Sequence, residues 1–250
     1  MYRFYVEIGA IDGQKVRLTD EDNNHIRNVL RMKAGDEIIV CDGYGKDYHC
    51  RLEELSKDRV EAKILSMSLS YTELPVRIVL FQGMPKKDKM EFIIQKAVEL
   101  GVAEVIPVNT KRTVVRLEDE KKEQKKLERW QAIAKAAAMQ SMRGIVPQIG
   151  KVCSFTEALE YAKQLDAAVI PYENARGIAQ TRKVISELAE KRVRSVGIFI
   201  GPEGGFEEDE IAQADAAGAK TITLGHRILR TETAGLVALS LLMFAFEQAE

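Results

Sequence analysis

The sequence is poor in the residues that form disulfide frameworks and metal centres. Its 250 residues include three cysteines and three histidines. Cys41, Cys50 and Cys153 have neither the even number of a disulfide framework nor the close paired spacing of a zinc site. We therefore expect structural thiols and no bound metal.

Long apolar runs and an excess of one charge are also missing. No apolar run is long enough to cross a bilayer, and residues 1–7 carry an early acid, so no secretory signal is predicted. The 37 basic and 38 acidic side chains leave a net charge of −1, and 46% of the residues are hydrophobic. This composition is typical of a soluble globular protein, so we expect a cytoplasmic protein with no membrane partner.

The near-neutral total hides a basic middle segment. Residues 75–150 carry 15 basic and nine acidic side chains. A basic face suits an anionic partner such as RNA, because phosphate binding releases counterions. The run Lys121–Lys126, taken alone, is equally compatible with a solvated helix face.

Residues 1–70 predict a small β-rich unit with one helix. Thr19 to Asp22 is a helix start of the capping-box type, and Gly35 marks the exit. The sequence of residues 42–45, Asp-Gly-Tyr-Gly, is a hairpin signal between two strands. Residues 66–75, which are polar and end in proline, are the predicted linker. Apolar residues alternate as in half-buried strands at 2–6, 38–40 and 60–64.

From Val76 onward, short apolar runs alternate with helical patterns. This order predicts an α/β fold with a parallel sheet that helices cover on both faces. No internal repeat or low-complexity tract is found. The predicted strands are 76–81, 105–108, 167–171, 196–200 and 220–224, and the predicted helices are 90–101, 118–142, 179–191, 207–217 and 233–248.

Two loops near the C-terminus are the most informative segments. Gly201-Pro202-Glu203-Gly204-Gly205 follows one predicted strand, and the segment 224–234 follows the next. Both leave the carboxyl edge of the expected sheet, where open α/β folds bind ligands.

The first loop supplies backbone that can approach a ligand closely, because glycine tolerates positive φ. It is neither a GxGxxG fingerprint nor a phosphate-binding loop with a Walker lysine. A tight strand-to-helix connection with no ligand is the alternative reading. The acids Glu207–Glu210 then occupy the first turn of a helix, where they favour the helix dipole, and they are interpreted as structural.

The second loop mixes charged and apolar side chains. Arg227, Arg230 and Glu232 alternate with Ile228 and Leu229 in a stretch too short and too mixed for a regular core element, which favours a ligand-binding role. The following threonines, at 231 and 233, can instead cap the last helix. That helix is apolar nearly all round, so we expect it to be buried against the sheet and against a second subunit.

In combination, these motifs resemble the SPOUT class of methyltransferases, and within it the family that methylates N3 of a uridine in 16S ribosomal RNA. The resemblance covers the whole chain. The matching segments are Gln95–Val102, Arg129-Trp130, Gln140–Arg143, Gly201–Gly205, Leu224-Gly225 and Arg227–Ala234.

The resemblance implies two domains and a cofactor. Residues 1–70 would form a PUA-like β-barrel domain that binds RNA, and residues 75–250 a SPOUT domain with a C-terminal trefoil knot. The cofactor would be S-adenosylmethionine, and the partners would be a second copy of the chain and 16S ribosomal RNA or the 30S subunit. The implied cofactor contacts are Ile170, Pro171, Tyr172, Glu173, Ile200, Gly201, Pro202, Glu203, Gly204, Gly205, Leu224, Gly225, Ile228, Leu229, Thr233 and Ala234.

Two residues are the catalytic candidates. Uracil N3 is a weak acid, so its proton has to be removed or its anion stabilised. Arg230 is the first candidate, as a cation that hydrogen-bonds a uracil carbonyl and stabilises the developing charge. Glu232 would orient Arg230 or accept the proton.

Seven basic residues are candidates for contacts with RNA. An ordinary surface salt bridge is equally compatible with any one of them, and those of the N-terminal unit are proposed by analogy. They are Arg3, Arg27, Arg31, Lys96, Arg112, Arg129 and Arg143.

Two other functions stay open at this point. One is a 2′-O-ribose methyltransferase of the same fold class. The other is a non-catalytic RNA-binding module with an empty or regulatory pocket.

Overall fold

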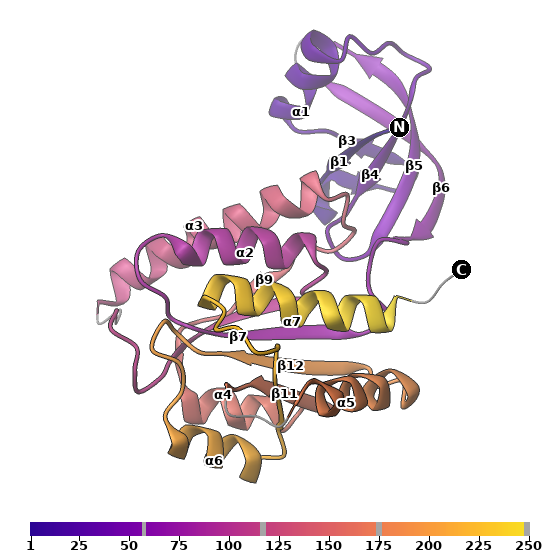
Figure 1. Cartoon of the computed structure of the whole chain (residues 1–250). Helices are drawn as coiled ribbons and strands as arrows, with labels where there is room; N and C mark the ends of the chain where they lie inside the picture. The colour runs from indigo at the N-terminus through magenta and orange to yellow at the C-terminus, as the bar shows by residue number, and fades with distance from the viewer. Residues whose placement is uncertain (57–58, 116–118, 174–176, 248–250) are drawn as a thin grey trace. The chain divides into compact units, whose positions relative to one another are not determined.

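The chain folds into two compact units, which are described separately. The computed structural model describes residues 1–250 except 57–58, 116–118, 174–176 and 248–250 (Figure 1). One unit comprises residues 1–73 and 138–146, and the other comprises 74–137 and 147–250. The domain limits 1–70 and 75–250 stay a prediction.

The N-terminal unit is a six-stranded sheet in the order β1-β4-β5-β6-β3-β2. β1 pairs with β4 in parallel and the other neighbours are antiparallel. Alternating residues such as Ile38 and Val40 are fully buried, because one face of each strand packs on the core. The strands are β1 Tyr2–Tyr5, β2 Ile11–Asp12, β3 Lys15–Arg17, β4 Glu37–Cys41, β5 Lys46–Leu55 and β6 Val60–Leu69.

The capping and hairpin signals in this unit are confirmed, whereas the predicted helix exit at Gly35 is wrong, because the helical residues end at Val29. The hydroxyl of Thr19 accepts a hydrogen bond from Asp22 N at the start of α1, Asp20–Asn24, which continues as a π-helical turn, His25–Val29. The predicted hairpin joins β4 and β5. The predicted linker is wrong in its first part, because residues 66–69 extend β6 and pair with β5.

Residues 138–146 are attached to the N-terminal unit by polar contacts. The Tyr5 hydroxyl donates to the carbonyl of Arg143, and the Glu73 carboxylate accepts from Gly144 N (2.8 Å) and Ile145 N (3.1 Å). Nothing in the local sequence pattern indicates this pairing, because the contacts join segments about 70 to 140 residues apart.

The C-terminal unit is built on a parallel sheet in the order β10-β8-β7-β12-β11-β13, with β9 also pairing with β8. All its pairings are parallel, as the alternation of strands and helices predicts. The strands are β7 Arg77–Gly83, β8 Glu104–Asn109, β9 Gln148–Ile149, β10 Cys153–Ser154, β11 Ala167–Pro171, β12 Ser195–Ile200 and β13 Lys220–Ile222.

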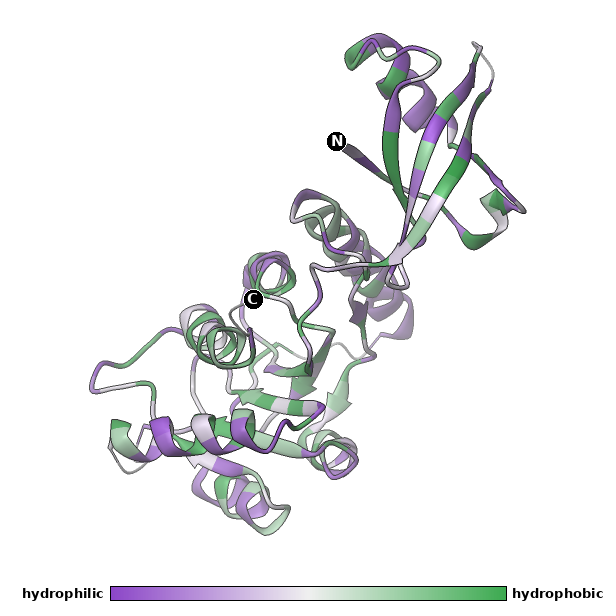
Figure 2. Ribbon diagram, turned by 90° about the vertical axis from the view of Figure 1, so that its right-hand side faces the viewer, coloured by the Kyte–Doolittle hydropathy of each residue, from purple (hydrophilic) through white to green (hydrophobic). Residues whose placement is uncertain are grey.

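Helices cover both faces of this sheet. On one face, α7 packs on β12 and against α2 (Figure 1). On the opposite face, α4 and α6 contribute to the core. Hydrophobic residues gather along the central strands, as Figure 2 shows by colour. The helices are α2 Lys89–Glu99, α3 Glu120–Gln140, α4 Phe155–Ala162, α5 Ile178–Glu190, α6 Glu208–Ala216 and α7 Thr231–Phe246.

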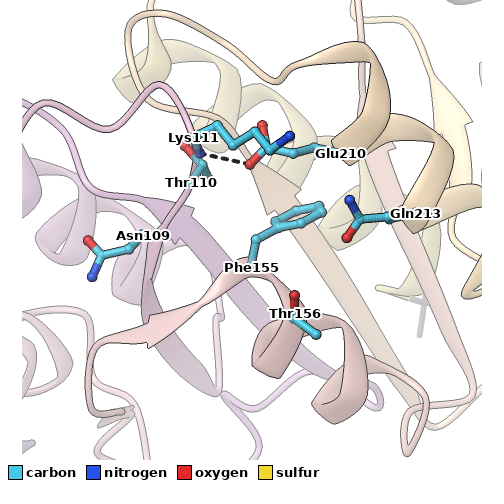
Figure 3. Close-up of a pocket in the computed structure, with 7 residues that line it drawn as sticks. All are labelled: Asn109, Thr110, Lys111, Phe155, Thr156, Glu210 and Gln213. Carbon is cyan, nitrogen blue, oxygen red and sulfur yellow. Dashed lines mark hydrogen bonds between the residues drawn. The ribbon is translucent and has the colours of Figure 1, made fainter.

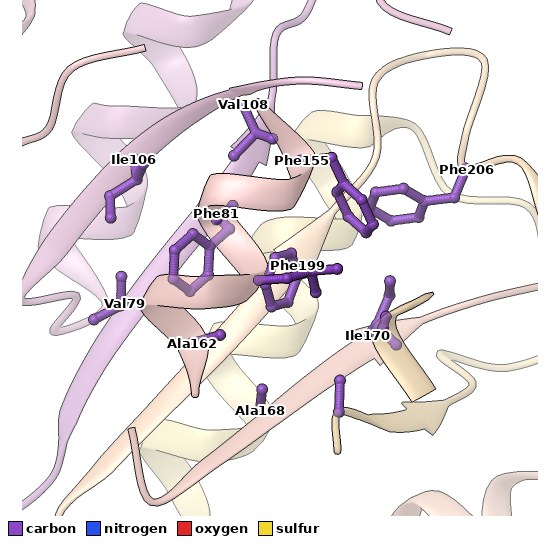
Figure 4. Packing of buried hydrophobic residues seen from close by; sticks show 14 residues of the cluster. Val79, Phe81, Ile106, Val108, Phe155, Ala162, Ala168, Ile170, Phe199 and Phe206 are labelled. Carbon is purple, nitrogen blue, oxygen red and sulfur yellow. The ribbon is translucent and has the colours of Figure 1, made fainter. Parts of the chain in front are cut away.

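One core cluster fixes the central strands against α4 and α6 (Figure 4). Phe81 of β7 and Phe199 of β12 stack with ring centroids 4.5 Å apart, and Phe155 of α4 packs edge-on against Phe199. Such aromatic pairs add to the free energy gained from burying apolar area. The neighbouring strands β7 and β12 are thereby held in one register, which positions the loops at their ends.

In the C-terminal unit the prediction missed three elements and misplaced some ends, and in the N-terminal unit it missed the short strands β2 and β3. α4, β9 and β10 were not predicted, although Ser154 and Glu157 form a capping box at the start of α4, a signal readable in the sequence. α3 ends at Gln140 rather than at residue 142. The predicted start of that helix at Glu118 and the predicted end of the last helix at Gln248 lie outside the described residues.

Candidate functional site

The carboxyl ends of four strands lie along one edge of the parallel sheet. Ile200 of β12 pairs with Gln82 of β7, and Pro171 of β11 pairs with Ile222 of β13. Tyr172 N continues the second pairing with a 2.9 Å hydrogen bond to the Ile222 carbonyl. The loops that follow these strands therefore begin side by side, as the parallel topology predicts.

The first predicted loop packs directly on the end of β7. Gly205, at φ +69°, closes a turn in which its N–H donates to the Pro202 carbonyl at 2.9 Å. A Cβ on Gly83 would lie 2.6 Å from Pro202 N, a distance that no side chain can take. Glycine at position 83 is therefore needed for the loop to approach the strand.

A buried hydrogen-bond chain joins the first loop to α7. The Thr231 hydroxyl donates to the Gly201 carbonyl (2.6 Å), and Gln82 Nε2 donates to the Thr231 oxygen (2.9 Å). The interpretation of Thr231 as a helix cap is wrong, because the N-cap is Arg230 and its side chain makes no capping bond. Gln82 is fully buried, and its Oε1 has no protein partner within the described ranges.

Arg112 holds the outer side of the same loop. Its Nη1 donates to the Gly204 carbonyl at 2.7 Å, and its Nε donates to Glu207 at 2.8 Å. The hydrogen bond from Arg112 lowers the pKa of Glu207 below its ordinary value. Arg112, which the sequence analysis predicts as an RNA contact, therefore uses its guanidinium to hold the loop.

Lys89, at the start of α2, connects the two predicted loops. Its ammonium nitrogen lies 3.0 Å from Glu203 of the first loop and 3.1 Å from Glu232 in the first turn of α7. Hydrogen bonds to Glu203 and Glu232 raise the pKa of Lys89. Burial alone would raise the pKa of Glu203, but backbone N–H donors and Lys89 outweigh it and hold that pKa low.

The second predicted loop is more exposed. Its start is fixed by Thr181 of α5, whose hydroxyl donates to the Thr223 carbonyl (2.8 Å) and accepts from Thr223 N (2.9 Å). Beyond this point Ile228 is 89% exposed, and Arg227 and Arg230 are exposed as well. Across the part of the chain that the structure describes, neither arginine forms an ion pair.

The catalytic candidates are close in sequence, but no hydrogen bond or ion pair joins them among the described residues. Arg230 is the N-cap of α7, and Glu232 is the second residue of the helix, in its first turn. The ion-pair partner of Glu232 in the described structure is Lys89, so the predicted orientation of Arg230 by Glu232 has no supporting contact here.

The remaining cofactor candidates lie along the same loops with graded exposure. Ile170, Ile200 and Pro202 are buried. Pro171, Tyr172, Gly201, Gly205, Leu224, Gly225, Leu229 and Ala234 are half-buried, and Glu173, Glu203, Gly204, Ile228 and Thr233 are exposed.

Two of the seven RNA candidates are corrected by the structure. The side chains of Arg3 and Arg143 are only 2% and 4% exposed and pair with Asp47 and Glu73, respectively. A guanidinium buried in an ion pair cannot reach a phosphate without leaving its partner uncompensated. Both residues are structural parts of the N-terminal unit.

The other RNA candidates are at least partly accessible. Lys96 pairs with Glu99 in the same helix, and Arg129 of α3 pairs with Glu91 of α2. In the N-terminal unit Arg27 is half-buried, and Arg31 is exposed at φ +54°.

The acids and cysteines behave as the sequence predicts. Glu207 and Glu210 form the capping box of α6, and Glu210 also accepts from Lys111 N at 2.9 Å. All three cysteines are free thiols. Burial raises the pKa of Cys50 and Cys153 to about 11, which keeps them protonated and unreactive at neutral pH.

A hollow of about 240 Å³ lies beside the end of β8 and the start of α6 (Figure 3). No predicted site residue lines it. Lys111 and Glu210, which flank it, are linked by the hydrogen bond drawn in Figure 3. Of the described residues, no three His, Cys, Asp or Glu side chains are grouped to hold a metal ion, and no helix has the length and hydropathy to cross a membrane.

Three residues at this edge were missed by sequence reasoning. Gln82, Gly83 and Lys89 follow or end β7, a strand that was itself predicted. Because β7 neighbours β12, its end contributes to the same edge. The sequence did indicate where β7 ends, which is the one signal that could have found these residues. It does not reveal the strand order that makes β7 a neighbour of β12.

Two family models match successive parts of the chain. A family described as "RNA methyltransferase domain" matches residues 72–243, and one described as "RNA methyltransferase PUA domain" matches residues 18–65. The first of these covers more than half of the chain.

Individual relatives match over nearly their whole length. The ribosomal RNA small subunit methyltransferase E of Bacillus subtilis is 39% identical, with 99% of this chain and 98% of the relative covered. That of Mesomycoplasma hyopneumoniae is 35% identical, with 96% and 98% covered.

A solved structure has the same fold. The ribosomal RNA small subunit methyltransferase E of Neisseria gonorrhoeae, bound to S-adenosyl methionine, gives a TM-score of 0.80 at 36% identity, with 98% of each chain covered. Its likeness extends over both the β-rich and the α/β parts. The chain therefore belongs to the RNA methyltransferase family that includes the ribosomal RNA small subunit methyltransferases E.

Proposed function

We propose that this protein transfers a methyl group from S-adenosylmethionine to N3 of a uridine in 16S ribosomal RNA. The observation that carries the proposal is that the ends of β7, β12, β11 and β13 lie along one edge of the sheet, where the glycine-rich loop and the segment with the exposed Arg230 both begin. Full-length similarity to ribosomal RNA small subunit methyltransferases E supports the same activity.

The residues at this edge fit such a donor. S-adenosylmethionine supplies an electrophilic methyl group on a positively charged sulfur. Two carboxylates, Glu203 and Glu232, face one ammonium, Lys89, so the group carries one negative charge in excess. The buried Gln82 Oε1 is an unused acceptor at the same edge. Excess negative charge and a free acceptor both suit a cationic ligand with hydrogen-bond donors.

The protein's main chemical task is to align the acceptor and favour its reactive form. The N3 proton of uracil leaves to a base or to water, and the N3 electron pair then forms the new N–C bond as the C–S bond breaks. Arg230 hydrogen-bonds a uracil carbonyl and stabilises the negative charge that deprotonation places on the ring. Glu232, which is paired with Lys89, carries a negative charge in the first turn of α7, two residues after Arg230.

The loops divide the recognition task. The backbone of residues 170–173, 200–205 and 224–229, with Thr233 and Ala234, holds the donor. The exposed basic residues contact RNA phosphates, and the target base leaves its stack to reach the site. The PUA-type N-terminal unit, with Arg27 and Arg31, contributes to RNA binding.

A homodimer completes the proposed assembly. α7 carries Phe244, which is 84% exposed, and α2 carries the exposed Phe92. Large apolar side chains on two helices that pack together support burial against a second copy. The proposed substrate is 16S ribosomal RNA, free or in the 30S subunit, and the proposed location is the cytoplasm.

The test is to map the methylated atom. Purified protein, labelled S-adenosylmethionine and unmodified ribosomal RNA are combined, and the digested RNA is analysed by mass spectrometry. A methyl group on uracil N3 is expected. A methyl group on a ribose 2′ oxygen would reassign the protein to the ribose-methylating branch, and calorimetry showing no binding of S-adenosylhomocysteine would favour a non-catalytic RNA-binding module.

A further inference from the structure

We propose that Lys89 is a positioning residue that locks the donor-binding loop to the first turn of α7. This inference rests on the proposed function and adds a residue outside the predicted loops. The side chain reaches Glu203 in the loop at 3.0 Å and Glu232 in α7 at 3.1 Å. One ammonium therefore joins three segments, since Lys89 itself begins α2.

The Glu203 carboxylate is held from two sides. Besides Lys89, it accepts from the backbone N–H of Lys86, with its two oxygens 3.1 and 3.2 Å away. The turn that presents this N–H contains Lys87 at φ +57°, a conformation that costs free energy for any residue but glycine. Strained backbone of this kind persists where the surroundings fix it, and it clusters at functional sites.

The charges explain why the lysine is needed. Glu203 and Glu232 both lie within 3.1 Å of the same nitrogen, so their carboxylates are near neighbours. Without the ammonium they would repel each other at short range in a partly buried setting. The loop would then be pushed away from α7, the helix whose N-cap is Arg230.

The decisive experiment removes the ammonium and then one carboxylate. Lys89→Met is expected to speed hydrogen exchange of the amides of residues 203–205 and to weaken S-adenosylhomocysteine binding by about tenfold or more, since two like charges are left unpaired. Adding Glu203→Gln in the same chain removes the repulsion, so part of the affinity should return. Lys89→Arg keeps the charge and should stay close to the wild type.

The control is Lys183→Met. Lys183 is an exposed α5 lysine paired with Glu187 at 3.8 Å, with no hydrogen bond or ion pair to either loop in the described structure, so its loss should leave loop exchange and binding unchanged. A lysine with a merely structural role would lower the melting temperature without a rescue by Glu203→Gln. Unchanged loop exchange, or losses that simply add in the double variant, would overturn the proposal.

A second variant and a readout that does not depend on catalysis cover the remaining outcomes. If Lys89→Met does not fold, Glu232→Gln cuts the same link from the other end, and faster exchange in the first turn of α7 is then required. Hydrogen exchange does not depend on catalysis. The two proposals can therefore fail separately. If the wild type does not methylate RNA, but the loop exchanges faster in Lys89→Met, the proposed function is refuted and the positioning role is retained.

Discussion

The two loops that define the site are held in opposite ways. The loop Gly201–Gly205 is fixed through side chains of three other segments, Arg112, Lys89 and Thr231. The loop 224–230 is fixed at its start by Thr181 and then becomes exposed, with two arginines that pair with no acid in the described structure.

This difference indicates two tasks. A loop held rigidly can present backbone atoms in one arrangement, which suits a small donor of constant shape. An exposed loop with unpaired cations suits a large anionic substrate that arrives from solution. We infer that the first loop serves the donor and the second serves RNA and the chemical step.

The largest expected effect comes from Arg230→Ala. Because Arg230 is assigned to stabilising charge on the uracil ring and not to holding the donor, single-turnover methylation should fall by about 100- to 1,000-fold. Calorimetric affinity for S-adenosylhomocysteine should change little. Arg182→Ala, at an exposed position of α5, is the matched control and should methylate normally. An equal loss of both quantities in Arg230→Ala would move this residue to the donor site.

The next largest effect tests the close approach of the first loop to β7. The Cβ of Gly83→Ala would meet backbone at Pro202, so the free energy of unfolding should fall by about 1–3 kcal/mol, measured by urea denaturation. Donor affinity should fall with it because the loop is displaced. Gly9→Ala places its Cβ in open space and serves as the control. A Gly83→Ala protein that binds the donor normally would show that the loop need not be rigid.

A smaller effect distinguishes two roles of Arg112, the anchoring of the first loop and a contact with an RNA phosphate. If Arg112 anchors the loop, Arg112→Gln should weaken donor binding by about three- to tenfold, because three hydrogen bonds to carboxylate or carbonyl oxygens are lost. The slope of log affinity for RNA against log salt concentration should be unchanged. A slope reduced by about one unit would instead identify a phosphate contact.

The smallest expected effect is the pH dependence of the loop contacts. The pKa values of Glu203 and Glu207 are below their ordinary value of 4.5 in the folded protein, so their contribution to stability is present above pH 4.5 and lost as the pH falls through the lowered values. The unfolding free energy of the wild type minus that of a Glu203→Gln, Glu207→Gln variant should be constant from pH 8 to 5 and shrink below pH 4.5. A difference that stays constant in acid would show that these carboxylates are not held more tightly in the folded state.

Much of the fold could be predicted from local patterns. β11 has the predicted bounds, and the strands β7, β8 and β12 and the helices α2, α5 and α6 lie within a few residues of the predicted ones, because apolar periodicity reports which face of an element is buried. The capping box at Ser154 carried the signal for α4, yet the short strands β9 and β10 around it are too brief for any periodicity to show.

The candidate site was predictable only in part. Gly201–Gly205 and the segment with Arg230 were found because glycine and charged residues that follow an apolar run form a pattern in the local sequence. Lys89, Gln82 and Gly83 were missed, since their partners lie about 114 to 149 residues away in the chain. The burial of Arg3 and Arg143 was missed for the same reason, because an arginine's partner decides whether it is a surface cation or a buried one.

The sequence by itself determined the α/β class, the β-rich N-terminal segment and the two loops, because these depend on periodicity and on residues with special backbone freedom. The tertiary structure decided which strand ends are neighbours, which charges neutralise each other and which arginines are free to meet a substrate. Those properties depend on distances between segments remote in the chain, and strand order and packing set these distances.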